Sequence, residues 1–134
     1  MTYYKNEPDL YNDVVGQSED ALQQKCYFWF WNAYPKYRGL LFHIPNGGSR
    51  SKREAKKFKQ IGVVSGVADL TLLFNGYAYF IELKAENGTQ SSNQKKWQKS
   101  VTEEGFNYYL IYSLKDFKLL VNGLIDGWKN LLGE

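Results

Sequence analysis

The sequence has almost none of the residues that build disulfides or zinc sites. Cys26 is the only cysteine and His43 is the only histidine among its 134 residues. A single cysteine excludes an internal disulfide and suits a reducing, intracellular setting. Zinc sites need several His or Cys ligands, so zinc fingers and His-based metalloproteases or nucleases are poor candidates. Any bound metal must then take carboxylates, carbonyls and waters, which suit hard ions such as Mg²⁺ or Mn²⁺.

Long apolar runs are also missing. The densest run, CYFWF at 26–30 with Trp31 after it, is far shorter than the roughly 20 residues that a membrane helix needs. The first residues, MTYYKNEPDLYND, lack the basic-then-apolar pattern of a signal peptide. We therefore expect a soluble, cytoplasmic protein that is not secreted and has no membrane partner.

The material for a folded core is present. The chain is 43% hydrophobic and 17% aromatic, which argues against disorder. Its length suits one domain over residues 1–134, with one core. The 17 Lys and Arg against 14 Asp and Glu give a net charge of +3, which is compatible with a polyanionic partner without proving one.

The residue pattern predicts an α/β domain. Ser18 as an N-cap, acids after it and Pro35 beyond the end predict the first helix. The later part of that helix, around 26–31, is apolar on nearly all sides, so it belongs to the core or offers a surface for self-association. The predicted elements are, in chain order, a helix over 18–33, a strand over 40–44, a helical or irregular stretch over 50–60, strands over 68–74 and 77–85, a helix over 91–104, a strand over 106–112, and one or two helices over 114–132.

The dipeptide Asn75-Gly76 sets the geometry of the central hairpin. Two apolar runs joined by Asn-Gly favour a two-residue type I′ turn, in which Phe74 pairs with Tyr77. The same register puts Asp69 opposite Glu82, with Cβ atoms about 4.5–5.5 Å apart.

Lys84 is two residues beyond Glu82 and projects on the same face. Opposed carboxylates repel one another unless a cation binds between them. A lysine beside them can orient an attacking water or offset charge on a phosphoryl group. The structural alternative is a salt bridge of Lys84 with Glu82 or Asp69 on an exposed edge.

The pattern of charged residues resembles the PD-(D/E)xK nuclease superfamily. It consists of an aspartate at the end of one strand, Glu-x-Lys on the next strand, and an acid on a leading helix. The order and spacing of four further segments resemble the VRR-NUC domain, over about residues 18–120. These segments are IPNGG at 44–48, IGVVSGVADLTLLF at 61–74, FIELKAENGTQSSNQKKWQ at 80–98 and GFNYYLIYSLKDF at 105–117.

The resemblance implies a restriction-endonuclease-like α/β fold with a central mixed sheet of about four strands flanked by helices. It implies a divalent-metal-dependent DNA nuclease whose catalytic lysine is Lys84. The site residues that it implies are Glu19, Asp69 and Glu82 as metal ligands, the carbonyl of Leu83 as a further ligand, Gln94 beside the metal, and Gln23 in support. Ala68 departs from the proline usual before the aspartate, which only stiffens the chain there.

Several of these residues have simpler explanations that stay open. Glu19 suits the first turn of a helix electrostatically, and Gln94 can form a capping box with Ser91. His43 is either structural or a DNA contact. Glycines 47 and 48 allow close backbone approach or a plain turn.

The basic stretch at 50–59 is a solvated helix face or, as we predict, a phosphate-binding surface. Its cationic members are Arg50, Lys52, Arg53, Lys56, Lys57 and Lys59.

We therefore predict a structure-selective endonuclease that uses one or two Mg²⁺ or Mn²⁺ ions. Its partners would be DNA, branched or flapped, and a second copy in a homodimer, as in resolvase-like enzymes of phage or bacterial replication, recombination or repair. The alternatives are a DNA-binding module that kept the fold and does not cut, and a structural protein with a salt-bridge cluster. Exonuclease action also stays open.

Overall fold

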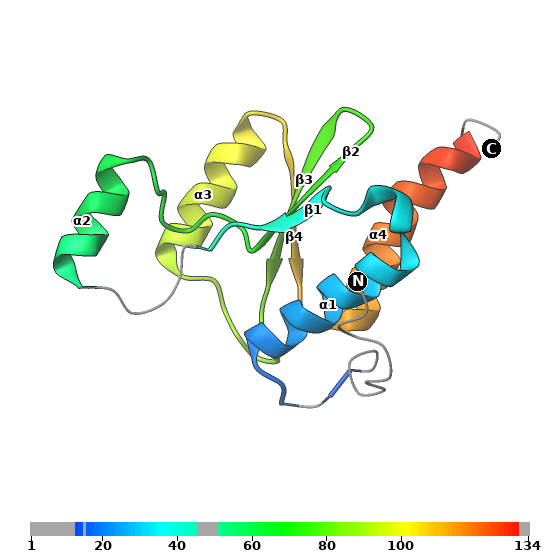
Figure 1. Ribbon diagram of the computed structural model, residues 1–134, viewed down its shortest axis with the longest axis horizontal. Coiled ribbons are helices and arrows are strands. Elements are labelled where there is room, and N and C mark those ends of the chain that lie inside the picture. The colour runs from blue at the N-terminus through cyan, green and yellow to red at the C-terminus, as the bar shows by residue number, and fades with distance from the viewer. Residues whose placement is uncertain (1–12, 15, 46–50, 132–134) are drawn as a thin grey trace.

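The computed structural model describes residues 13, 14, 16–45 and 51–131, which form one mixed β-sheet with helices around it (Figure 1). The elements are α1 (Glu19–Ala33), the 3₁₀ helix η2 (Pro35–Tyr37), β1 (Leu41–His43), α2 (Lys52–Gln60), β2 (Leu70–Phe74), β3 (Tyr77–Leu83), α3 (Ser92–Glu103), β4 (Asn107–Ile111) and α4 (Leu114–Leu131). The strand order is β1-β2-β3-β4, with β3 and β4 parallel and the other pairs antiparallel. This confirms the predicted α/β class and four-stranded mixed sheet.

Serine caps begin the helices where the sequence predicts them. The Ser18 hydroxyl accepts the N–H of Ala21 at 3.1 Å to start α1, and Ser91 starts α3. Gly105, with φ +93°, follows the end of α3. The helices predicted over 18–33 and 91–104 are thus confirmed. The basic stretch is helical, and the closing segment is a single helix rather than two.

The central hairpin has the predicted register. Asn75 and Gly76 have φ values of +51° and +82°, as a type I′ turn requires. Phe74 pairs with Tyr77 and, at the other end of the ladder, Leu70 pairs with Ile81. One step further along this register is Asp69, opposite Glu82.

Helices α1 and α4 cover one face of the sheet and contact each other. The buried apolar residues of this core are Leu22, Cys26 and Phe30 from α1, Leu41, Leu70, Leu72, Phe74, Ile81, Leu83 and Ile111 from the sheet, and Leu114, Phe117, Val121 and Ile125 from α4. Phe28 and Phe30 are buried, so this part of the apolar run belongs to the core. The self-association surface stays a prediction.

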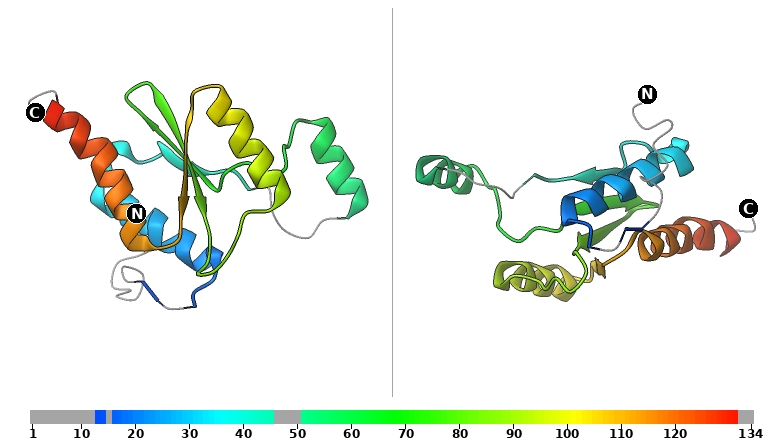
Figure 2. Two further views of the ribbon diagram at one scale, coloured as in Figure 1. Left: turned by 180° about the vertical axis from the view of Figure 1, so that it is seen from behind. Right: turned by 90° about the horizontal axis from the view of Figure 1, so that it is seen from below.

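Helix α3 covers the opposite face, on the side of the sheet away from α1 (Figure 2). Its Trp97 packs edge-on against Phe80 of β3, with ring centroids 4.8 Å apart. The face that carries Glu82 is therefore covered, which explains why its other residues are largely apolar.

Helix α2 stands away from the sheet in both figures, and none of its residues is buried. The loop that leads back from it packs on the start of α3, where the Asn93 side-chain amide donates to the Ser65 hydroxyl at 3.0 Å. Gly66 allows this approach, because a Cβ there would lie 2.3 Å from the Asn93 carbonyl oxygen. None of the described helices is both long and apolar enough to cross a membrane.

Candidate active site

A cavity of about 540 Å³ opens beside the start of β2 and collects predicted site residues from four parts of the chain. We call it the strand-end cavity. Its lining includes Glu19 and Gln23 of α1, His43 of β1, Asp69 before β2, and Gln94 of α3. Sequence reasoning thus found most of its polar residues.

Asp69 lines this cavity and lies opposite Glu82 in the hairpin register. The Asp69 carboxyl is close enough to Glu82 to raise the pKa of that group, and Asp69 Oδ2 accepts the backbone N–H of Leu83 at 2.8 Å. The latter bond fixes the Asp69 carboxylate at the end of the hairpin. The Leu83 carbonyl points to the same side of β3 as its N–H in an extended strand, which is the side on which Asp69 lies.

Glu82 is fully buried, and both of its carboxylate oxygens have donors. The Gln94 side-chain amide donates to Oε1 at 3.2 Å, and the Tyr108 hydroxyl donates to Oε2 at 3.3 Å. Burial, and then the hydrogen bond and negative charge of Asp69, raise the pKa of Glu82 well above its ordinary 4.5, against the lowering effect of Lys84. A cation between the two acids would oppose this shift, because it favours the charged form of both carboxylates.

Lys84 is buried and pairs with Glu19, not with the acids of the hairpin. Its Nζ lies 3.4 Å from Glu19 Oε1, and its backbone N–H donates to the Ile111 carbonyl at 2.9 Å. The structural alternative, an exposed salt bridge of Lys84 with Glu82 or Asp69, is therefore wrong. The partner is Glu19, and the Lys84 side chain is buried. The ion pair holds the first turn of α1 against the end of β3.

Gln94 serves as both a cap and a site residue. Its Oε1 accepts the backbone N–H of Ser91 at 2.8 Å and completes a capping box. Its Nε2 is then directed to Glu82. The two explanations offered by the sequence are compatible.

Sequence reasoning missed Asp20, which lines the cavity, and three polar residues on the far side of Glu82, namely Gln90, Gln98 and Tyr108. The Gln90 amide donates to Gln98 Oε1 at 2.9 Å and to the Tyr108 hydroxyl at 3.1 Å. Because Gln90 is the donor, the Tyr108 hydrogen is left for Glu82. Tyr108 pairs with Phe80, two residues before Glu82 on the same face. This parallel pairing is the only signal that could have found it.

The remaining predicted residues lie around the cavity. His43 lines it, and its Nδ1 donates to the Asp69 carbonyl at 2.6 Å, since a carbonyl can only accept. The basic side chains of α2 are exposed and do not line the cavity; those described are Lys52, Arg53, Lys56, Lys57 and Lys59. Arg50 and glycines 47 and 48 lie outside the described residues.

The oxygen ligands of the site are of the kind that a hard divalent cation prefers. Their arrangement fits such an ion only in part. Asp69 and Glu82 offer carboxylate oxygens from opposed positions of the hairpin, and Leu83 offers a carbonyl on the same side. Within the described part of the chain, no group of three or more His, Cys, Asp or Glu side chains is arranged to hold a metal ion. The third acid, Glu19, is engaged by Lys84.

The fold has a known counterpart. A solved structure named "VRR_NUC domain protein" superposes with a TM-score of 0.68 at 24% sequence identity, and the match covers 84% of this chain and 92% of that one. No family model and no curated protein matches the sequence. The likeness establishes the class of fold: α/β, restriction-endonuclease-like. Within that class the chain has the VRR-NUC arrangement of sheet and helices.

Proposed function

We propose that this chain is a DNA nuclease dependent on Mg²⁺ or Mn²⁺, and that it cuts as a structure-selective endonuclease in replication, recombination or repair. The observation that carries the proposal is the placement of Asp69, which lines the open cavity, opposite the buried Glu82 in the hairpin register. Keeping two acids together in a covered place is unfavourable, and a catalytic cation is the use that the fold likeness supports.

Asp69, Glu82 and the Leu83 carbonyl would hold the ion, with Glu19 as a further ligand. When bound, the ion would polarise the scissile phosphate and stabilise charge on the leaving oxygen. Gln94 and Tyr108 hold the Glu82 carboxylate in position.

The cationic residues bind and orient the DNA. Lys84 offers a fixed positive charge beside the acids, where it can orient the attacking water or offset charge on the phosphate. Gln23 supports this side of the cavity, and the basic face of α2 neutralises phosphates further along the strand. A homodimer would present two such sites to a branched or flapped substrate.

The test is cleavage of branched, flapped, linear and supercoiled DNA with Mg²⁺ or Mn²⁺. We expect Asp69→Ala and Lys84→Ala to abolish cutting, while Lys95→Ala, an exposed lysine on α3, leaves it unchanged. Asp69→Asn keeps an acceptor for the Leu83 N–H, so its loss of activity separates the effect of charge from the effect of folding. Equal activity in wild type, Asp69→Ala and Lys84→Ala would reject the assignment.

The second candidate is a DNA-binding module that does not cut. It is favoured by the Glu19–Lys84 ion pair, which engages one predicted ligand. Titration calorimetry with Mn²⁺ separates the two functions, because a pure binder has no reason to hold the ion. Saturable binding that Asp69→Asn removes supports the nuclease.

A further inference from the structure

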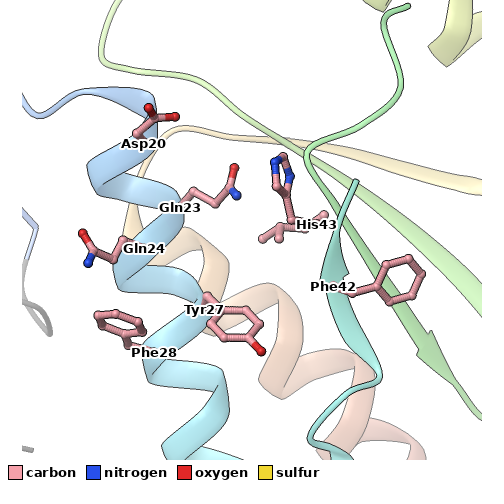
Figure 3. A pocket seen from close by; sticks show the side chains of 8 residues that line it. Asp20, Gln23, Gln24, Tyr27, Phe28, Phe42 and His43 are labelled. Carbon is pink, nitrogen blue, oxygen red and sulfur yellow. The ribbon is translucent and has the colours of Figure 1, made fainter. Parts of the chain in front are cut away.

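A second cavity, of about 470 Å³, lies between α1 and β1 next to the strand-end cavity. We call it the side pocket. The two cavities share Asp20, Gln23 and His43, so a molecule that fills one is adjacent to the other. Figure 3 shows the Gln23 side chain of α1 directed across the gap toward His43 of β1, with the Tyr27 ring below them.

The lining of the side pocket suits an uncharged, flat group. Among the described residues that line it there is no Lys or Arg, and the acid is Asp20, at the first turn of α1. Unlike the strand-end cavity, which adds Glu19 and Asp69, the described lining of the side pocket has a single acid and so no set of ligands for a cation that would offset the charge of a phosphate. The half-buried Tyr27 ring and the buried Leu70 offer apolar contact, while the Gln23 amide and the Asp20 carboxylate can pair with the donors and acceptors of a base edge.

We propose that the side pocket binds one unpaired nucleobase of the DNA strand whose phosphate lies in the strand-end cavity, and this rests on the proposed function. A base inside a duplex is stacked and paired, so it must be unpaired or extruded to enter. The chain would then favour DNA with an unpaired nucleotide beside the scissile phosphate, such as a flap or a single-stranded end, over a continuous duplex.

The Tyr27 ring is the stacking platform. Base stacking on an aromatic side chain is sequence-tolerant, so the preference would concern DNA structure more than base identity. Removing either the ring or the base should weaken binding by about tenfold, and removing both should cost no more than removing one.

The experiment is a binding cycle with Ca²⁺ in place of Mg²⁺ or Mn²⁺, so that the acids still hold a cation beside the phosphate while cutting is suppressed. Fluorescence anisotropy measures the affinity of wild type and Tyr27→Leu for a flapped duplex and for copies in which single flap nucleotides are abasic. We expect one abasic position to weaken the wild type about tenfold and Tyr27→Leu hardly at all. Tyr27→Phe keeps the ring and should keep the abasic penalty, which separates stacking from a change of packing around α1. Tyr77→Leu, at the exposed tip of the hairpin, is the matched control.

The outcomes separate this proposal from the nuclease assignment. If wild-type protein cuts DNA with Mn²⁺ but its affinity for every abasic substrate is the same as for the intact flapped duplex, the side pocket does not bind a base. The nuclease assignment is then unaffected. An equal penalty in wild type and Tyr27→Leu also overturns the side-pocket proposal, because the base then lies elsewhere. Wild-type protein that neither binds nor cuts DNA removes both proposals.

Discussion

The buried charged residues next to the strand-end cavity and the basic residues of helix α2 are both proposed to act in DNA cleavage, yet the fold holds them in opposite ways. Glu82 and Lys84 are buried, and their polar atoms have named partners. The cationic side chains of α2 are exposed on a helix that stands away from the sheet. The buried charges depend on the fold and on protonation. The exposed charges of α2 act through electrostatic attraction that salt screens. Each region can therefore be altered without the other.

The largest effect is expected at the buried acid. Glu82→Gln keeps the shape of the side chain and removes its charge, so Mn²⁺-dependent cleavage should fall on the order of 10²- to 10³-fold. Single-turnover cleavage of a flapped duplex measures this. Glu103→Gln, on the exposed side of α3, is the control. Full activity in Glu82→Gln would show that cleavage does not require the charge of Glu82.

The same variant also tests the protonation of Glu82 without metal. Its pKa is raised in the folded protein, so its contribution to stability is complete below its ordinary pKa and is lost as pH rises through the folded value. In EDTA the melting temperature of the wild type should therefore fall from acid toward alkaline pH. Glu82→Gln, which stays neutral, should fall less. Parallel curves for the two proteins would contradict the shift.

Substitutions in helix α2 should weaken the affinity for DNA and leave the stability of the fold unchanged. Changing Lys52, Arg53, Lys56 and Lys57 together to Gln should weaken DNA binding about tenfold to a hundredfold at low salt. The slope of log affinity against log salt should also be reduced, by about 0.9 for each phosphate that is no longer neutralised. The free energy of unfolding should change by less than about 0.5 kcal/mol per residue, because these side chains are exposed. Lys115→Gln on α4 is the control for general charge, and an unchanged slope in the fourfold variant would place the DNA elsewhere.

The loop that joins the two regions depends on a glycine that approaches α3 closely. Gly66 has φ +86°, and an added Cβ would meet the Asn93 carbonyl at 2.3 Å. Gly66→Ala should therefore lower the free energy of unfolding by about 2 kcal/mol or more. Gly66→Ala has two costs, the positive φ and the clash with Asn93. Gly62 has φ +98° and open space around it, so Gly62→Ala has only the cost of the positive φ. Equal destabilisation of the two variants in chemical denaturation would show that the close approach to α3 is unimportant.

The parts of the site that the sequence could predict follow from local chemistry. The Asn75-Gly76 turn allows one hairpin register, and that register is enough to bring Asp69 and Glu82 together. Ser18 and Ser91 mark helix starts through hydrogen bonds within four residues of the cap.

The remaining parts depend on long-range packing that no turn determines. β3 and β4 are joined through α3, so their parallel register, and with it the position of Tyr108, follows from how α3 packs. The choice of Glu19 as the partner of Lys84 similarly depends on where α1 docks. That α2 stands away from the sheet could not be predicted from its charge, which suits a solvated face in either position.

The smallest effect concerns Tyr108, one of the residues that the sequence did not reveal. Tyr108→Phe removes one donor to Glu82 and leaves the ring packed against Trp97. Partners that orient a metal ligand are typically worth about 10–100-fold in affinity, and because the Gln94 donor remains, we expect Mn²⁺ binding by calorimetry to weaken about tenfold. The melting temperature in EDTA should change little, and Tyr109→Phe, the neighbouring position on the opposite face, should bind Mn²⁺ normally. Unchanged Mn²⁺ affinity in Tyr108→Phe would mean that burial and Gln94 alone hold Glu82, so that the polar chain from Gln98 and Gln90 through Tyr108 serves only to pack α3 on the sheet.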